Sequence, residues 1–237
     1  MRLLYDKKLA SHYDDFTLSG YYDYSKEVEV IKNIVGKRRT LLELGSGTGN
    51  LIIPLAKSGF DVTGIDNSPV MIKILKQKQQ KESITFPNFK ADQRKLSLGR
   101  KFEVIVASGG LIWFVTLKNK LYLSMYGSLY KDVEKTFENV SNHLEKGGLF
   151  LVNIQHHGQT FNLKLKSGGD YHFEIEFKTP SKIVKTHYLE KNGKIIFKRA
   201  FPQRLFPEEV VRDTAKKFGF KILEVDKTNS FFVYEKL

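Results

Sequence analysis

Apolar residues follow two different spacings between residues 36 and 155. Short, nearly continuous apolar runs predict buried strands at 40–45, 61–66, 84–92, 102–109 and 149–155. Between them, apolar residues recur at helical spacing over 50–59, 68–82 and 121–148. Ser68 followed by Pro69 is typical of a helix N-cap and its first helical position. Strands that alternate with helices predict a mostly parallel sheet covered by helices on both faces.

The pattern changes after His157, where polar and apolar residues alternate and predict strands with one polar side. Asn192 and Gly193 separate two such stretches and predict a type I′ hairpin turn. The other elements expected from the sequence are two amphipathic helices over 5–35, an antiparallel layer near 170–206, a helix over 207–220, and strands at 221–225 and 231–236.

Composition narrows the class of protein. The 237 residues include no cysteine, which excludes disulfides, cysteine zinc sites and thiol nucleophiles. The first residues contain no apolar stretch typical of a secretory signal. The longest nearly apolar run, 104–115, is shorter than the roughly 20 residues that span a bilayer. We therefore expect a cytoplasmic protein that makes no membrane contact, as a monomer or a homodimer.

The net charge of +13 raises the question of an acidic partner. Most of the excess is lysine spread along the chain, as on a solvated surface, so nucleic acid is not the expected partner. The charge alone leaves an acidic substrate or RNA open.

A glycine-rich loop follows the first predicted strand of the sheet. The segment "ELGSGTG" places Gly45, Gly47 and Gly49 at alternate positions, just before a helix. Ligands of open α/β sheets bind beyond the carboxyl ends of the strands, and glycine lets backbone approach them closely. Asp66 ends the second strand, 17 residues after Gly49, where a carboxylate can accept hydrogen bonds from both hydroxyls of a ribose. The pair of features indicates a nucleoside cofactor.

Five segments together resemble the motifs of class I S-adenosylmethionine-dependent methyltransferases. In chain order they are "ELGSGTG", "GIDNSPVMI", "KADQRKL", "FEVIVASGG" and "LEKGGLFLV". They cover about residues 36–155 in the order and spacing of the family. One departure is Glu103, where the family more often has aspartate.

The resemblance implies an α/β fold, with a Rossmann-like seven-stranded, mostly parallel sheet and helices on both faces. An antiparallel insertion is expected between strand five and the last helix. We expect one domain over 1–237. Its parts are an N-terminal helical cap (1–35), a cofactor-binding core (36–155), an antiparallel substrate-side insertion (158–206), and a closing helix with two strands (207–237).

The resemblance also implies S-adenosylmethionine as cofactor, with S-adenosylhomocysteine as product, and assigns residues to it. Asp66 would take the ribose hydroxyls, Met71 would pack on the adenine, and Glu43 would orient the loop or meet the methionine part. The full set of expected cofactor contacts is Glu43, Gly45, Ser46, Gly47, Gly49, Asp66, Asn67, Met71, Asp92, Gln93, Ser108, Gly109 and Tyr22.

The expected acceptor side lies beyond strands four and five and in the N-terminal segment. His156 and His157 follow strand five and are the candidate general bases, with His157 preferred because the turn begins there. Trp113, Phe114 and Tyr13 are the candidate substrate contacts, although each also suits a packing role. No cluster with metal-ligand spacing occurs, so no metal is expected.

The predicted function is direct in-line methyl transfer to a small-molecule acceptor, with nitrogen preferred to oxygen. No Asn/Asp-Pro-Pro-Tyr/Phe segment follows strand four, which argues against exocyclic amines of nucleic-acid bases. Two alternatives stay open at this point. One is an RNA or protein methyltransferase that uses the basic surface, and the other is a protein that binds the cofactor without methylating, such as a cyclase.

Overall fold

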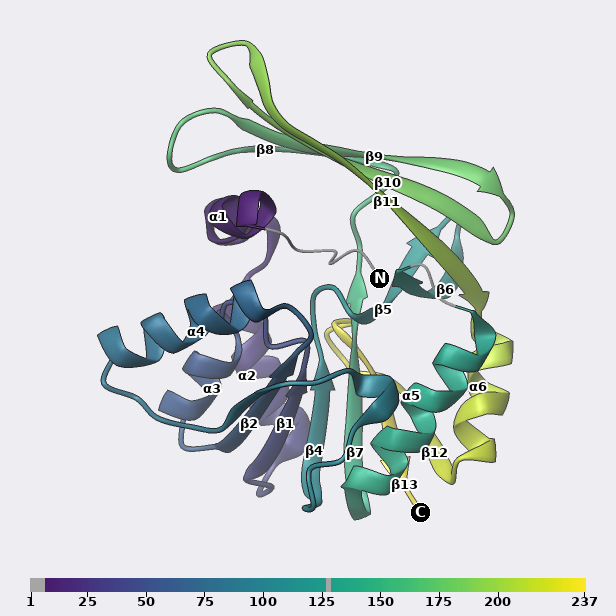
Figure 1. Ribbon diagram of the computed structural model, residues 1–237. Coiled ribbons are helices and arrows are strands. Elements are labelled where there is room, and N and C mark those ends of the chain that lie inside the picture. The colour runs from purple at the N-terminus through teal and green to yellow at the C-terminus, as the bar shows by residue number, and fades with distance from the viewer. Residues whose placement is uncertain (1–6, 127–128) are drawn as a thin grey trace.

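The computed structural model describes residues 7–126 and 129–237 and contains two layers (Figure 1). The lower layer is a sheet with the strand order β3-β2-β1-β4-β7-β13-β12, and the upper layer is antiparallel. The strands of the lower sheet are β1 (Thr40–Leu44), β2 (Asp61–Asp66), β3 (Asn88–Lys90), β4 (Phe102–Ala107), β7 (Leu144–Gln155), β12 (Phe220–Val225) and β13 (Phe231–Lys236).

Helices cover both faces of this sheet, because residues along each strand alternate between two apolar cores. On β1, Leu41 packs with α2, α3 and α4, whereas Leu42 and Leu44 face the core that includes α5 and α6. The helices are α2 (Tyr24–Val35), α3 (Ile52–Lys57), α4 (Pro69–Lys81), α5 (Tyr130–His143) and α6 (Glu208–Lys217). β1 to β4 and β7 run parallel, and β13 runs antiparallel to both β7 and β12, which confirms the predicted Rossmann-like fold.

The antiparallel layer has the order β5-β6-β11-β10-β9-β8 and joins the lower sheet where β5 pairs with β7. Its strands are β5 (Ile112–Leu117), β6 (Lys120–Tyr126), β8 (Thr160–Lys164), β9 (Asp170–Thr179), β10 (Lys182–Lys191) and β11 (Lys194–Pro207). Asn192 and Gly193 have φ angles of 52° and 70°, which confirms the predicted hairpin turn between β10 and β11.

One prediction at the element level is wrong. The sequence suggests a helix over 121–148, but 120–126 form strand β6, α5 covers only 130–143, and β7 already begins at residue 144. In β6 the side chains of Leu123 and Met125 point into the core at every second position. Since β6 pairs with β5 on one side and β11 on the other, tertiary pairing outweighs local helix propensity. The hairpin β5–β6 therefore adds to the expected antiparallel insertion.

In the N-terminal segment, residues 7–16 lie between the two layers, whereas α2 packs against the lower sheet (Figure 1). The segment consists of α1 (Lys7–Phe16), a π-helical turn (Thr17–Tyr21) and α2. Phe16 and Tyr21 pack into an aromatic cluster of the antiparallel sheet, where Phe16 stacks on Tyr171 at a centroid distance of 4.6 Å. Across the described parts of the chain, each helix is too short or too polar to cross a bilayer.

Candidate active site

The glycine-rich loop leaves β1 with its backbone turned toward a cleft. The amides of Gly45 and Ser46 both donate to the carbonyl of Ile65 at 2.8 Å. Gly47 has a φ of 52°, and a Cβ there would meet no neighbouring atom closer than 3.9 Å, so this side of the loop is open. Gly49 serves packing instead, since a Cβ would lie 2.9 Å from Ile53.

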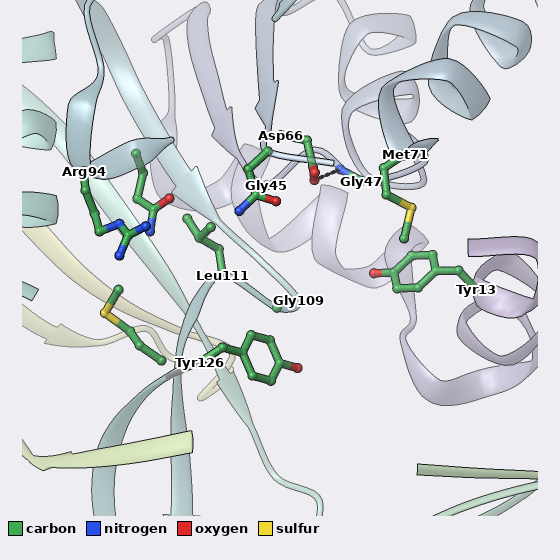
Figure 2. Close-up of a pocket in the computed structure, with 13 residues that line it drawn as sticks. Tyr13, Gly45, Gly47, Asp66, Met71, Arg94, Gly109, Leu111 and Tyr126 are labelled. Atoms are coloured by element: carbon green, nitrogen blue, oxygen red, sulfur yellow. Dashed lines mark hydrogen bonds between the residues drawn. The ribbon is translucent and has the colours of Figure 1, made fainter. Parts of the chain in front are cut away.

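The cleft lies where the parallel strands end, and it has a volume of about 690 Å³, part of it open to solvent. Figure 2 shows Asp66 accepting a hydrogen bond from the Gly47 amide, which has a length of 3.0 Å. Tyr13 reaches the cleft from α1 and Tyr126 from β6. The lining residues are Tyr13, Gly45, Gly47, Asp66, Asn67, Met71, Gln93, Arg94, Gly109, Gly110, Leu111, Met125 and Tyr126.

Three buried or half-buried carboxyl groups lie beneath and beside the loop. Burial raises the pKa of Glu27 to about 7, and burial with the charges of Glu27 and Asp66 raises the pKa of Glu43 well above its ordinary range. Burial also raises the pKa of Asp66, against backbone hydrogen bonds from Ser68 and Gly47. The Oε2 atom of Glu43 has no hydrogen-bond partner within the described residues. Such a site suits a ligand that carries positive charge.

Several predicted cofactor contacts line this cleft, and others lie behind it. Asn67, Met71, Gln93 and Gly109 line it, in addition to Gly45, Gly47 and Asp66, whereas Glu43 and Gly49 are not part of the lining. The Ser46 hydroxyl donates to Asn88 at 3.1 Å and the Ser108 hydroxyl donates to Glu27 at 2.8 Å, and neither residue is part of the lining.

Asp92 is likewise placed behind the cleft. Its carboxylate caps the short 3₁₀ helix that follows β3 and pairs with the guanidinium of Arg94 at 2.6 Å. The hydrogen bond from Arg94 lowers the pKa of Asp92 below its usual value. Arg94 itself lines the cleft and also pairs with Asp132 on α5. Sequence reasoning missed Arg94, although it stands two positions after Asp92 in the third motif.

A second, smaller pocket of about 290 Å³ adjoins the cleft. The two share four lining residues, Tyr13, Gly109, Gly110 and Tyr126. The smaller pocket adds aromatic side chains from the N-terminal segment and polar side chains from β7 and β10. These additional residues are Phe16, Tyr21, Tyr22, Gln155, Lys185 and His187.

Lys185 and His187 were not identified from the sequence. Both point inward from β10, on the same face as Ile183 and Leu189, and they are only 5% and 8% exposed. Burial lowers the pKa of Lys185 to about 7. Burial and the nearby Lys185 lower the pKa of His187 well below its ordinary range. The sequence does contain a signal for them. Ile183 and Leu189 indicate that the odd-numbered positions of this strand face inward, and these include 185 and 187.

The structure does not bring His156 or His157 to the cleft or to the smaller pocket. After β7 the chain turns away, and the exposed His156 places Nε2 2.6 Å from the carbonyl oxygen of Asn229. His157 packs its ring against Tyr21 and Phe161, at centroid distances of 4.6 and 4.4 Å. Burial lowers the pKa of His157 to about 4. Both histidines line another surface hollow, which shares Tyr21, Tyr22 and Gln155 with the smaller pocket. Neither histidine lines the smaller pocket or the cleft, so the geometry does not support either as the base.

Trp113 and Phe114 also lie outside both pockets. They are neighbours on β5 and point to opposite faces, as strand geometry requires. Phe114 is fully buried and stacks on Phe232 at 4.7 Å, and Trp113 packs against Tyr126 at 5.0 Å. Both are core residues. Trp113 packs against Tyr126, and Tyr126 rather than Trp113 lines both pockets. Of the predicted substrate contacts, Tyr13 is the one that reaches them.

The strand order, the glycine loop after β1 and the carboxylate that ends β2 define a Rossmann-like protein that binds a nucleoside cofactor. The chain belongs to the class I S-adenosylmethionine-dependent methyltransferase family. A family model described as "Methyltransferase domain" matches residues 20–225.

Curated relatives agree with this family. A carboxy-S-adenosyl-L-methionine synthase of Nautilia profundicola is 30% identical over 135 residues, which are 54% of this chain and 57% of the relative. The putative methyltransferase YqeM of Bacillus subtilis is 29% identical over 147 residues, 61% of this chain and 53% of the relative. The matches thus span about half the length of these relatives.

Solved structures share the fold over nearly the whole chain. An S-adenosylmethionine-dependent methyltransferase from Clostridium acetobutylicum is 22% identical with a TM-score of 0.70, covering 96% of this chain and 97% of that one. The sugar N-methyltransferase KedS8 from a Streptoalloteichus species has a TM-score of 0.73 at 17% identity, covering 100% and 97%. The amino pentose methyltransferase CalS10 from Micromonospora echinaspora, solved with S-adenosylmethionine bound, has a TM-score of 0.72 at 13% identity and covers both chains fully.

S-adenosylmethionine is the cofactor of this family, and the cleft has the chemistry to hold it. The cofactor is a cation at sulfur. Asp66 lines the cleft, and the buried Glu43, whose Oε2 has no hydrogen-bond partner within the described residues, lies behind its lining. The open side of Gly47 leaves room for a ligand against the backbone.

Proposed function

We propose that this protein transfers the methyl group of S-adenosylmethionine to a small-molecule acceptor, at nitrogen in preference to oxygen. The observation that carries the proposal is the smaller pocket, which continues directly from the cofactor cleft through Gly109, Gly110, Tyr13 and Tyr126. An acceptor there would lie next to the cofactor without leaving the protein.

Individual cofactor contacts follow from the placement of the lining residues. Asp66 would accept the ribose hydroxyls, and Glu43, buried behind the lining, would balance the positive methionine end. Met71 and Gln93 would meet the adenine. Gly45, Gly47 and Gly109 would let the cofactor lie against backbone.

The size and cover of the smaller pocket favour a small acceptor over a macromolecule. The pocket has a volume of about 290 Å³. α1 and the antiparallel sheet enclose it, and Phe16 and Tyr21 of the N-terminal segment are part of both the pocket and the aromatic cluster of that sheet. An RNA strand or a folded protein would have to displace this cover to reach the smaller pocket.

Methyl transfer requires correct positioning of the acceptor rather than a residue that forms a covalent intermediate. When bound, the cofactor supplies an electrophilic methyl group on a positive sulfur. The chain then has to hold a nitrogen lone pair in line with that methyl and keep water away. The aromatic rings of Tyr13, Tyr21 and Tyr126 form walls suited to both tasks. Nitrogen is preferred because an unprotonated amine attacks without a base. The names of the sugar N-methyltransferase and the amino pentose methyltransferase point the same way.

The experiment is a transfer assay with the purified chain and methyl-labelled S-adenosylmethionine. Small amines, matched small alcohols, total RNA and a mixed protein fraction are offered as acceptors. We expect label in a small amine and formation of S-adenosylhomocysteine. Label in RNA or protein alone would contradict the proposal.

The same assay follows the cofactor itself, because one relative is named as a synthase of a carboxylated S-adenosylmethionine. If the cofactor is consumed but the label stays on a modified form of the cofactor, the protein does not transfer the methyl group. The non-methylating alternative would then hold.

A further inference from the structure

We propose that the acceptor carries an oxyanion, a carboxylate or a phosphate, and that Lys185 and His187 bind it in the smaller pocket. This inference rests on the proposed function, since it concerns the acceptor of that reaction. It is carried by the contacts of two buried side chains on one face of β10.

Lys185 is a buried amine without an acidic partner in the described chain. Its Nζ donates one hydrogen bond of 2.7 Å to the Tyr21 hydroxyl and lies 3.8 Å from the ring centroid of Phe173. No ion pair to a carboxylate is present for it among residues 7–126 and 129–237. An ammonium has three donors, and burying it without an opposite charge is costly. A bound oxyanion would supply both the charge and the acceptors.

His187 adds a second unsatisfied polar atom two positions further along the same strand face. Its Nδ1 lies 2.7 Å from the Tyr171 hydroxyl, which leaves Nε2 as the free ring atom. Nε2 is buried and has no hydrogen-bond partner within the described residues. When Nδ1 accepts from Tyr171, Nε2 carries the proton and can donate it to an anion beside Lys185.

Charge is divided between the two connected pockets. Glu27, Glu43 and Asp66 gather around the cofactor loop, whereas the described lining of the smaller pocket includes no aspartate or glutamate. A cationic acceptor would meet Lys185 on one side and the cofactor sulfonium on the other, both unfavourable. An anionic group is attracted by both. The same two positive charges favour the neutral form of an acceptor amine, which is the form that attacks.

The alternative use of Lys185 is as a general base in its neutral form, and the two roles have opposite pH dependence. Anion binding requires the ammonium, so affinity falls as pH rises and binding takes up a proton. A base requires the free amine, so turnover rises with pH. The Tyr21 hydroxyl and the Phe173 ring hold the Nζ of Lys185 in place, and the contact with the ring favours the ammonium, the form that binds an anion.

The test is calorimetric titration of the S-adenosylhomocysteine complex with acetate and, separately, with inorganic phosphate. Chloride at equal ionic strength is the reference, and two buffers of different ionisation enthalpy report proton uptake. Lys185→Met removes the charge, Lys185→Gln is a second variant, and Lys182→Met removes an exposed lysine of the same strand as the matched control. Thermal unfolding verifies that each variant is folded.

We expect wild type and Lys182→Met to bind one of the two oxyanions with proton uptake above neutral pH. Both Lys185 variants should bind it at least about tenfold more weakly. Tighter binding of acetate would indicate an acceptor that carries a carboxylate, and tighter binding of phosphate would indicate an acceptor that carries a phosphate. Equal binding by wild type and both Lys185 variants, or no binding of either anion to wild type, would overturn the inference.

The outcome is separable from that of the transfer assay, because the titration involves no methyl transfer. Lys185-dependent anion binding with no labelled acceptor would count against the proposed function and support the anion site. Labelled neutral amines with no Lys185-dependent anion binding would support the proposed function and overturn the anion site.

Discussion

Asp14 on α1 accepts a hydrogen bond of 2.5 Å from the Thr48 hydroxyl in the glycine-rich loop. The same carboxylate accepts from Asn50 at 2.9 Å and forms a 2.6 Å ion pair with Lys78 on α4. One side chain thus ties the N-terminal cap to the loop and to the next helix. Tyr13, the neighbouring residue on α1, lines both pockets, so this attachment also positions a wall of the site.

Asp14→Ala should weaken S-adenosylhomocysteine binding about tenfold, because the variant loses two loop hydrogen bonds and a partly exposed ion pair. Calorimetry measures the affinity, and hydrogen exchange over 7–16 should show faster opening of α1. Glu29→Ala is the matched control, since it removes an exposed carboxylate that pairs only within α2. Unchanged affinity in Asp14→Ala would mean that the cap contributes nothing to cofactor binding.

Asp66→Ala should reduce S-adenosylhomocysteine affinity by about 1–3 kcal/mol. The carboxylate is expected to accept two ribose hydroxyls, and it also holds the Gly47 amide at 3.0 Å. Asp66→Asn separates these effects, because the amide oxygen can still accept from the backbone. Asp61→Asn, at the exposed start of the same strand, should bind like wild type. Wild-type affinity in folded Asp66→Ala would refute the ribose assignment.

Glu27→Gln should change the proton balance of cofactor binding. In the folded protein the pKa of Glu27 is about 7, above its unfolded value of 4.5. The protonated carboxyl group therefore stabilises the folded protein at low pH, and this stabilisation is lost as pH rises through this window. A sulfonium cation nearby favours the ionised carboxylate, and binding S-adenosylmethionine near pH 7 should therefore release a proton.

Calorimetry in two buffers measures this release. Wild type should release more protons with S-adenosylmethionine than with the uncharged-sulfur product, and the difference should shrink in Glu27→Gln. Glu29→Gln, an exposed change on the same helix, should leave it intact. An identical difference in all three proteins would show that Glu27 does not sense the cofactor charge.

Lys185→Met should stabilise the protein near neutral pH, by about 1–3 kcal/mol, because it removes a buried amine that has no acidic partner in the described chain. The folded pKa of Lys185 is about 7 and the ordinary value is 10.5, so the unfolded chain binds more protons between these values. Wild-type stability should consequently rise with pH across this window, by at most about 1.4 kcal/mol per unit.

Urea unfolding at a series of pH values checks this. The curve for Lys185→Met should lack the rise and lie above wild type at pH 7, and Lys182→Met should follow wild type. Parallel curves for wild type and Lys185→Met would mean that Lys185 is not held with a lowered pKa.

The cofactor side of the site could be predicted from the sequence, because its residues come from loops that end adjacent parallel strands. Once β1, β2 and β4 are recognised, Gly47, Asp66 and Gly109 must meet at one edge of the sheet. Local motifs and sheet topology therefore suffice there.

The acceptor side could not be predicted in the same way, because it depends on pairings between distant segments. Lys185 reaches the pocket only because β10 pairs with β9 and β11, and β11 with β6. Tyr126 reaches it because 120–126 form a strand where local periodicity suggests a helix. The direction taken by His157 depends on the turn after β7, which no periodicity describes.

His157→Ala should keep turnover within about threefold of wild type on the true acceptor, between about pH 6 and pH 9. The ring lines neither the cleft nor the smaller pocket, and its pKa of about 4 leaves it neutral throughout this range. What it contributes is packing against Tyr21, so a small rise in KM for the acceptor is the expected effect. Lys185→Met is the informative comparison, because it should raise the KM for an anionic acceptor far more than His157→Ala does. A fall in turnover of about a hundredfold or more in His157→Ala, with unchanged cofactor affinity, would restore this histidine as the general base.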